Sequence, residues 1–325
     1  MPPFDAATVL IQLVGGLLFL AAGAELLVRG AARLARNLGV SAMVVGLTVV
    51  AFGTSSPEMT VSVFAAMRGQ ADIAVGNAVG SNIFNVLAIL GFTAMLCPIA
   101  VRGAFVRREI PVMIVVCLLL PWVGADEMVE RREAGLLLVL LILYVLFAYW
   151  IARREAGPVA ESFEQGVPKP EGRSGVNLFL IVLGLAMLVA GSHYLVEGSV
   201  AIARRAGLSE AVIGLTLVAA GTSLPELAAS AVAALRRQPD IAMGNIIGSN
   251  VFNILAIIGL SGALRPLRVS PELMRFDVWV MLAASVLIWP MTLSGRRISR
   301  WEGLVLFAGY IGYATYAVLH ALGKV

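Results

Sequence analysis

The sequence predicts an all-α polytopic membrane protein of about ten transmembrane helices, built as two inverted five-helix repeats. Three observations indicate this fold class. First, 59% of the 325 residues are hydrophobic, only 14% are charged, and the mean hydropathy is +0.91. Second, long apolar runs alternate with short charged connectors along the chain. Third, two blocks of sequence in the first half return in the second half at one fixed spacing.

The apolar runs have the length of membrane-spanning helices. About 20 mostly apolar residues are needed to cross a hydrocarbon core of roughly 30 Å, and the run at 177–196 meets that length. Because no water reaches the hydrocarbon core, such a run satisfies its backbone groups as a helix. The runs predict spans near residues 9–28, 41–67, 72–96, 109–125, 134–152, 177–196, 209–235, 241–263, 275–293 and 301–321.

The internal repeat divides these spans into two sets of five. The segment GLTVVAFGTSSPE at 46–58 returns as GLTLVAAGTSLPE at 214–226, and GNAVGSNIFNVLAILG at 76–91 returns as GNIIGSNVFNILAIIG at 244–259, both at a spacing of 168 residues. An odd number of spans in each copy makes the second copy enter the membrane in the opposite direction, so the repeat is inverted. We therefore expect a first repeat at 1–152, a linker at 153–175 and a second repeat at 176–325.

The basic residues predict the orientation of the chain in the membrane. Alternate connectors contain 15 of the 24 Lys and Arg residues, at 29–36, 102–108, 153–173, 236–237 and 296–300. Because basic residues accumulate in cytoplasmic loops, we expect these connectors in the cytoplasm and both termini outside. The cytoplasmic linker at 153–175 is polar and rich in Pro and Gly, and it has no folding signal of its own.

Two acidic residues, Glu58 and Glu226, lie inside apolar spans, and each directly follows a proline. A carboxylate near the bilayer centre costs roughly 2.5–3.5 kcal/mol or more, and a proline within a helix frees a carbonyl about four residues earlier. Both features become useful if a cation binds there, because carbonyls, hydroxyls and carboxylates are hard oxygen ligands. The predicted cluster joins both carboxylates to the carbonyls near Ala51 and Ala219 and to the hydroxyls of Thr54, Ser55, Thr222 and Ser223.

The alternative interpretation of these motifs is a kinked helix whose glutamate faces a buried arginine or extends to the membrane surface. No arginine occurs within any predicted span close to that depth, and both copies carry the same costly arrangement. These facts favour a functional site.

The second repeated block places polar residues along one helical face. Asn77, Ser81 and Asn85 are spaced by four, as are their counterparts at 245, 249 and 253. Small residues between them allow close helix packing, so packing alone is an alternative role for Asn77, Asn82, Asn245 and Asn250. The residues that lie deeper in their spans are expected to bind the ion or support its ligands: Ser81, Asn85, Ser249 and Asn253.

Together, the GTSSPE/GTSLPE and GNAVGSNIFN/GNIIGSNVFN blocks resemble the signature of the calcium/cation antiporter superfamily, specifically its bacterial sodium/calcium exchanger-like proteins with two alpha-repeats. The resemblance covers nearly the whole chain. It implies a secondary cation antiporter in which spans one and six slide against the other eight. It implies metal ligands at Glu58, Glu226, Thr54, Ser55, Thr222, Ser223, Ser81, Asn85, Ser249 and Asn253, with the backbone carbonyls of Ala51 and Ala219.

The same resemblance implies the protein's surroundings. Its partners would be small cations and the lipid bilayer, with Ca²⁺ and Na⁺ as transported ligands and no cofactor, and a monomer would be sufficient for transport. Its location would be the inner (plasma) membrane of a bacterium or an archaeon.

One departure from the family pattern concerns the charge of the site. Related proteins with a well-defined sodium/calcium site often carry an aspartate in one of the two GSN motifs, whereas this chain has Asn85 and Asn253 at the ends of these blocks. Two carboxylates balance one Ca²⁺ or two Na⁺, but a third Na⁺ would leave excess positive charge in a site of lowered dielectric.

Three functions compete on this basis. The first is Na⁺/Ca²⁺ exchange, with Ca²⁺ moving outward by alternating access at one midplane site. The second is exchange of Ca²⁺ or another cation for H⁺, because buried glutamates can bind protons. The third and weakest is a cation channel, because pores usually come from rings of repeated subunits and this chain has only a two-fold repeat.

Enzymatic and nucleic-acid roles are disfavoured. His193 and His320 are the only histidines, neither is near a buried serine, and the two glutamates have no metal-binding histidine partner. The net charge of +4 comes from arginines in connectors, where they set topology rather than bind nucleic acid. We therefore expect a transporter and not an enzyme.

Overall fold

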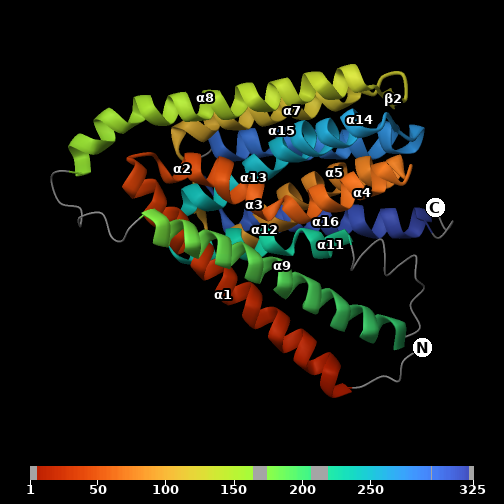
Figure 1. Ribbon diagram of the computed structural model, residues 1–325, viewed down its shortest axis with the longest axis horizontal. Coiled ribbons are helices and arrows are strands. Elements are labelled where there is room, and N and C mark those ends of the chain that lie inside the picture. Colours follow the sequence, from red (N-terminus) through yellow and green to blue (C-terminus); the bar gives the residue numbers. More distant parts are fainter. Residues whose placement is uncertain (1–5, 164–173, 206–218, 294, 322–325) are drawn as a thin grey trace.

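The structure of the protein, a computed structural model, describes residues 6–163, 174–205, 219–293 and 295–321. These residues are almost entirely helical (Figure 1). In the first half the elements are α1 (Ala6–Leu38), α2 (Ala42–Val45), the π-helical η1 (Gly46–Val50), α3 (Ala51–Thr54), α4 (Ser56–Met67), α5 (Ala71–Ile83), π-helical η2 (Phe84–Leu90), α6 (Gly91–Leu96), β1 (Ile99–Ala100), π-helical η3 (Phe105–Glu109), α7 (Ile110–Val123), β2 (Met128–Val129) and α8 (Arg131–Phe163). In the second half they are α9 (Ser174–Arg205), α11 (Ala219–Thr222), α12 (Leu224–Leu235), α13 (Pro239–Phe252), π-helical η5 (Asn253–Ile258), α14 (Gly259–Leu264), β3 (Leu267–Arg268), π-helical η6 (Leu273–Asp277), α15 (Val278–Leu293), β4 (Arg297–Ile298) and α16 (Arg300–Ala321).

The helices confirm the predicted fold class. Within the described residues, seven helices are long and apolar enough to cross a membrane, and the bent pair formed by Ala42–Thr54 and Ser56–Met67 makes an eighth. The predicted span at 109–125 corresponds to α7 with the end of η3 before it. The predicted span at 209–235 begins outside the described residues, and its described part contains α11 and α12.

The predicted linker is shorter than its composition indicated. Helix α8 continues to Phe163, and α9 begins at Ser174. Part of the segment expected to lack regular structure is therefore helical, because Ala, Arg and Glu in 152–155 and 160–161 favour continuation of the helix before it. The rest of the predicted linker, at 164–173, lies outside the described residues.

The two halves match element by element. The π-helical segment η3 (Phe105–Glu109) has its counterpart in η6 (Leu273–Asp277), and the short strand β1 has its counterpart in β3, each at the spacing of the sequence repeat. The strands also connect the halves, because β1 pairs antiparallel with β4 and β2 pairs antiparallel with β3. The halves therefore interlock and share one core.

Helices α1 and α9 form a pair that runs obliquely past the other helices (Figure 1). Their contact depends on glycines: a β-carbon added at Gly23 would lie 2.8 Å from the carbonyl oxygen of Gly184, and one added at Gly16 would lie 2.9 Å from that of Gly191. Small residues of this kind let two helix backbones approach closely. Over an apolar stretch of 18 residues in each helix, only 22% of α1 and 28% of α9 is buried.

The helices that carry the second repeated block lie at the centre. The apolar stretch of 18 residues in Pro239–Leu264 is 100% buried, and that in Ala71–Leu96 is 72% buried. In the peripheral α16, only 11% of the corresponding stretch is buried. The buried polar side chains on these two central spans must therefore be satisfied by other protein groups or by a ligand.

The ends of the long helices lie at two opposite sides of the molecule. In Figure 1 the N-terminal end of α1 and the C-terminal end of α16 lie at the right, whereas the C-terminal end of α8 and the N-terminal end of α9 lie at the left. This arrangement requires an even number of crossings between α1 and α16, with the predicted linker on the other side.

Candidate ion-binding site

The second membrane span of the first repeat is broken where the GTSSPE motif occurs. Helices α3 and α4 meet at Ser55 with a bend of 47° over the span. Pro57 lies in the first turn of α4, and Pro225 lies in the first turn of α12. The sequence suggested prolines inside continuous helices, and that expectation was wrong in detail. At a helix start the missing N–H of proline has no partner to lose.

The break places each glutamate in the first turn of a helix. Glu58 lies in the first turn of α4 and Glu226 in the first turn of α12. The partial positive charge at a helix N-terminus stabilises an ionised carboxylate. Each side chain is only 1% exposed, and the two carboxylates lie near each other, because each accepts a hydrogen bond from the serine three residues before the other glutamate.

The two repeats exchange hydrogen bonds at these glutamates. Ser55 Oγ donates to Glu226 Oε1 at 2.9 Å, and Ser223 Oγ donates to Glu58 Oε1 at 2.8 Å. Thr54 Oγ1 also bonds across the repeats, and it donates to Asn245 Oδ1 at 2.9 Å. Each carboxylate therefore depends on the motif of the other repeat for its partners.

The carbonyl oxygens expected to be free near the prolines already accept hydrogen bonds. Ala51 O accepts from the backbone N–H of Ser55 at 3.0 Å and from Thr54 Oγ1 at 3.3 Å. Gly53 O, four residues before Pro57, accepts from Ser56 Oγ at 2.7 Å, and Gly221 O accepts from Ser192 Oγ of α9. Ala219 begins α11. A cation contact to the Ala51 carbonyl would use its second lone pair.

The polar residues of the second block lie on central segments that pack against the helices of the two glutamates. Segment η2, which contains Asn85, packs on α12, and η5, which begins at Asn253, packs on α4. Asn85 and Asn253 are each 1% exposed. Ser81 lies 3.4 Å, Oγ to Oγ, from Ser223. Ser249 is fully buried, and its hydroxyl has no partner among the described residues.

Besides the Ser249 hydroxyl, four buried carboxylate and amide oxygens at this centre lack a hydrogen-bond partner among the described residues. They are Glu58 Oε2, Glu226 Oε2, Asn85 Oδ1 and Asn253 Oδ1. Buried polar atoms are almost always paired, so four orphan acceptors at matching positions of two repeats need an explanation. A bound cation would satisfy all four.

Asn77 and Asn245, for which the sequence left packing open as a role, support this cluster together with two serines that the sequence analysis did not name, Ser62 and Ser230. Asn77 Nδ2 donates to Glu58 O at 3.1 Å and to Ser62 Oγ at 2.9 Å. In the second repeat, Asn245 Nδ2 donates to Glu226 O at 3.3 Å and to Ser230 Oγ at 3.0 Å. These residues fix the backbone that carries the glutamates. The repeat spacing could have revealed the two serines, since 62 and 230 differ by the same 168 residues.

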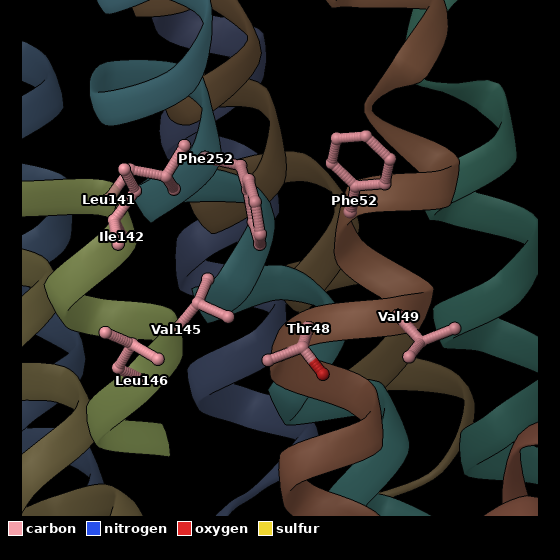
Figure 2. Close-up of a pocket in the computed structure, with 8 residues that line it drawn as sticks. All are labelled: Thr48, Val49, Phe52, Leu141, Ile142, Val145, Leu146 and Phe252. Carbon is pink, nitrogen blue, oxygen red and sulfur yellow. The ribbon is translucent and has the colours of Figure 1, made fainter. Parts of the chain in front are cut away.

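Another cavity, shown in Figure 2, has a different chemistry. It has a volume of about 440 Å³ and is lined by Thr48, Val49, Phe52, Leu141, Ile142, Val145, Leu146 and Phe252. Its only side-chain oxygen belongs to Thr48, whose hydroxyl already donates to Val44 O at 2.7 Å. This cavity lacks the oxygen ligands that a small cation requires.

Comparison with known proteins decides the family. Residues 8–150 and 176–319 match the family model described as sodium/calcium exchanger protein. The chain belongs to the sodium/calcium exchanger family. The predicted resemblance is thereby confirmed, and the protein is a cation antiporter of this family and not an enzyme.

Three relatives align with nearly all of this family member. CaxA of Alkalimonas amylolytica is 44% identical over 92% of this chain and 95% of its own. The sodium/calcium exchanger MaX1 of Methanosarcina acetivorans is 36% identical over 92% of this chain and 95% of its own. The inner membrane protein YrbG of Escherichia coli is 36% identical over 92% of this chain and 93% of its own.

A solved structure has the same fold. The sodium-calcium exchanger NCX_Mj, soaked with Na⁺ and Sr²⁺, superimposes with a TM-score of 0.80 at 30% identity, covering 94% of this chain and 97% of its own. This likeness confirms the prediction of an all-helical integral membrane protein.

Proposed function

We propose that this antiporter exchanges Na⁺ for Ca²⁺ at the central cluster, with Ca²⁺ moving outward and Na⁺ moving inward by alternating access. The ion ligands in this proposal are the twelve residues derived above, with the two glutamates and the two deep asparagines as its main members. The names of MaX1 and NCX_Mj as sodium/calcium exchangers support the ion pair.

The four unpartnered oxygens carry the proposal. Two come from carboxylates and two from neutral amides, so the cluster has a formal charge of −2 when both glutamates are ionised. One Ca²⁺ or two Na⁺ would neutralise that charge, and hard oxygen ligands suit both ions. Among the described residues, no three His, Cys, Asp or Glu side chains gather into a metal-binding group. A site with only two carboxylates can release its ion, as transport requires.

The peripheral helix pair supports the alternating-access part of the proposal. Helices α1 and α9 bury little of their surface, and glycines let them pack closely on each other, so the two can move as one unit against the other helices. Ser192 of α9 donates to Gly221 O beside the cluster, so a shift of α9 would reach the ion ligands directly.

Exchange of Ca²⁺ for H⁺ is the second candidate. Two glutamates buried to 1% exposure and close to each other are groups that a proton can neutralise in place of a cation. Ca²⁺/H⁺ exchange would use the same residues, with H⁺ in place of Na⁺ as the driving ion.

Transport by the purified protein in liposomes separates the two candidates. We expect uptake of ⁴⁵Ca²⁺ when an outward Na⁺ gradient is imposed, and none when a K⁺ or pH gradient replaces it. Uptake driven only by the pH gradient would support Ca²⁺/H⁺ exchange instead. Absence of Ca²⁺ uptake under all three gradients would contradict both candidates.

Orientation and organisation are part of the proposal. The concentration of basic residues in alternate connectors supports a cytoplasmic linker at 153–175 and outer termini, and the name of YrbG supports an inner-membrane location. We further propose that 1–152 and 176–325 act as one integrated domain of two repeats, because each repeat supplies partners to the other's glutamate. All groups of the cluster come from one chain, which supports a monomer as the transporting unit.

A further inference from the structure

The amide groups of Asn85 and Asn253 serve a cation only in one orientation. A carboxamide carries an oxygen at one end and an NH₂ group at the other, and half a turn about its last side-chain bond exchanges them. In the reverse orientation each NH₂ group would lie where the unpartnered oxygen now lies. The NH₂ group would repel a cation, so some group must hold the amides in place.

On one side of the molecule two hydrogen bonds hold Asn85. Asn85 Nδ2 donates to Asn250 Oδ1 at 3.1 Å, and Asn250 Nδ2 donates to the sulfur of Met113 at 3.4 Å. Asn250 is fully buried in α13, and Met113 is fully buried in α7. Within the described part of the chain, the Met113 sulfur is the acceptor for the Asn250 amide.

An equivalent set of bonds holds Asn253. Asn253 Nδ2 donates to Asn82 Oδ1 at 2.9 Å, and Asn82 Nδ2 donates to the sulfur of Met281 at 3.5 Å. Asn82 Nδ2 also lies 3.2 Å from Asn250 O and 3.9 Å from the sulfur of Cys117. Met113 and Met281 are separated by the repeat spacing of 168 residues, so both repeats use the same device.

The direction of each chain of hydrogen bonds is set by its last acceptor. A thioether sulfur and a backbone carbonyl can accept a hydrogen bond but cannot donate one. If Asn250 turned over, its oxygen would face the Met113 sulfur without a proton between them, and its NH₂ group would face the NH₂ group of Asn85. Each methionine therefore fixes one asparagine, which fixes the next, whose oxygen is left for the ion.

We infer that Met113 and Met281 are positioning residues of the ion site, which select the oxygen-inward orientation of Asn85 and Asn253 through Asn250 and Asn82. This inference rests on the proposed function, and it assigns to two apolar core residues a part in cation affinity. The competing explanation is that both methionines only fill space, as flexible side chains in cores commonly do.

Substitution by leucine separates positioning from packing. Leucine has nearly the volume of methionine but no acceptor, so a packing role tolerates the change. Loss of a group that orients metal ligands typically lowers metal affinity about 10–100-fold. For Met113→Leu we expect a half-saturating Ca²⁺ concentration raised about 10-fold, at the low end of that range. Met281→Leu should have a smaller effect, since Asn82 keeps the Asn250 carbonyl as an acceptor.

The measurement is Ca²⁺- and Na⁺-dependent thermal stabilisation of the purified full chain, together with the half-saturating concentration and the maximal rate of transport. If the methionines position the asparagines, the half-saturating Ca²⁺ concentration rises, whereas the maximal rate and the unfolding temperature without ions stay at the values of the parent. Met243→Leu is the matched control, because Met243 is fully buried on α13 and its sulfur accepts no hydrogen bond among the described residues.

A second substitution tests the direction of the hydrogen-bond chain that ends at Met113. An aspartate at 85 has oxygens at both ends and no orientation to lose, so Met113→Leu should no longer weaken Ca²⁺ binding in the Asn85→Asp background. Met281→Leu acts through the other set of hydrogen bonds, on Asn253, and should keep its effect in the Asn85→Asp background. Equal Ca²⁺ affinity of Met113→Leu and the parent, or an equal loss in both backgrounds, would overturn the inference. A parent that binds no cation would instead overturn the proposed function.

Discussion

At the level of single residues, the crossed serine–glutamate pairs make each carboxylate a shared property of the two repeats. Ser55 and Ser223 each satisfy one oxygen of the opposite glutamate, and the second oxygen of each carboxylate has no partner among the described residues. Such a group is costly in a dry interior unless an ion completes it.

Replacing either glutamate by glutamine should abolish exchange and leave the protein folded. Glu58→Gln and Glu226→Gln each remove a charge that the ion needs, and a neutral amide costs less in the membrane than a carboxylate. We expect ⁴⁵Ca²⁺ exchange at the background level of empty liposomes, with normal expression and a monodisperse gel-filtration peak. Glu272→Gln, at an exposed position, should transport like the parent. Near-parental flux in Glu58→Gln would remove the central claim.

Adding a third acid to the cluster should change its ion balance. Asn253→Asp brings the formal charge to −3 when all three carboxylates are ionised. We expect tighter cation binding and an additional Na⁺ per cycle at high pH, and a new dependence on pH because protons and cations then compete for three crowded carboxylates. Ca²⁺ affinity, Na⁺ coupling and pH profile measured in liposomes test this. If all three match the parent, Asn253 does not contact the ion.

The residues of the cluster could be predicted, but their supports could not. Glu58, Ser81 and Asn85 were accessible from sequence because a repeated polar residue in an apolar span is itself a signal. Met113 and Met281 gave no such signal, since a methionine in a membrane helix is ordinary. Their contacts to Asn250 and Asn82 join segments 137 and 199 residues apart, which only the folded chain brings together.

At the level of elements, the α1–α9 contact is the joint that holds together the two helices proposed to slide against the others. The sequence predicted both helices and their equivalence in the two repeats. It did not predict that they pack on each other, because the glycines that permit this are spread among many others in the chain. The π-helical segments η2 and η5, which contain Asn85 and Asn253, were also beyond prediction.

A bulky side chain at the glycine contact should impair this joint. At Gly23 a β-carbon would lie 2.8 Å from Gly184 O, so Gly23→Val should destabilise the protein by about 1–3 kcal/mol, the usual cost of overpacking. Slower transport should accompany the lower unfolding temperature in detergent. Gly15→Val is the control in the same helix, since no atom lies within 4 Å of a β-carbon there. Equal behaviour of the two variants would show that α1 does not depend on close contact with α9.

At the level of the whole molecule, the predicted architecture follows from counting spans and matching repeats. Hydropathy and the repeat spacing predict the right fold class because both are preserved over the full chain. They did not predict that the first part of the linker is helical, because a helix can extend beyond the membrane without an apolar pattern, as α8 does to Phe163.

Labelling with a membrane-impermeant thiol reagent should place the linker and the C-terminus on opposite sides. In a background with Cys97 replaced by serine, Ser162→Cys should react only from the cytoplasmic side and Lys324→Cys only from the outer side. The native Cys117 can stay, because it is fully buried. Reaction of both engineered sites from one side would contradict the odd number of spans that we predict between the linker and the end of the chain.

The crossed serine–glutamate contacts also bear on how such a chain could arise. Because Ser55 meets Glu226 as Ser223 meets Glu58, the contacts follow the rule of a two-fold symmetric pair of identical chains. A gene encoding one repeat, inserted into the membrane in both directions, would form the whole cluster in an antiparallel dimer. Duplication and fusion would then add no new contact to the cluster. They would instead allow the two copies to diverge, so that Asn85 or Asn253 can be substituted while the equivalent asparagine of the other repeat is retained.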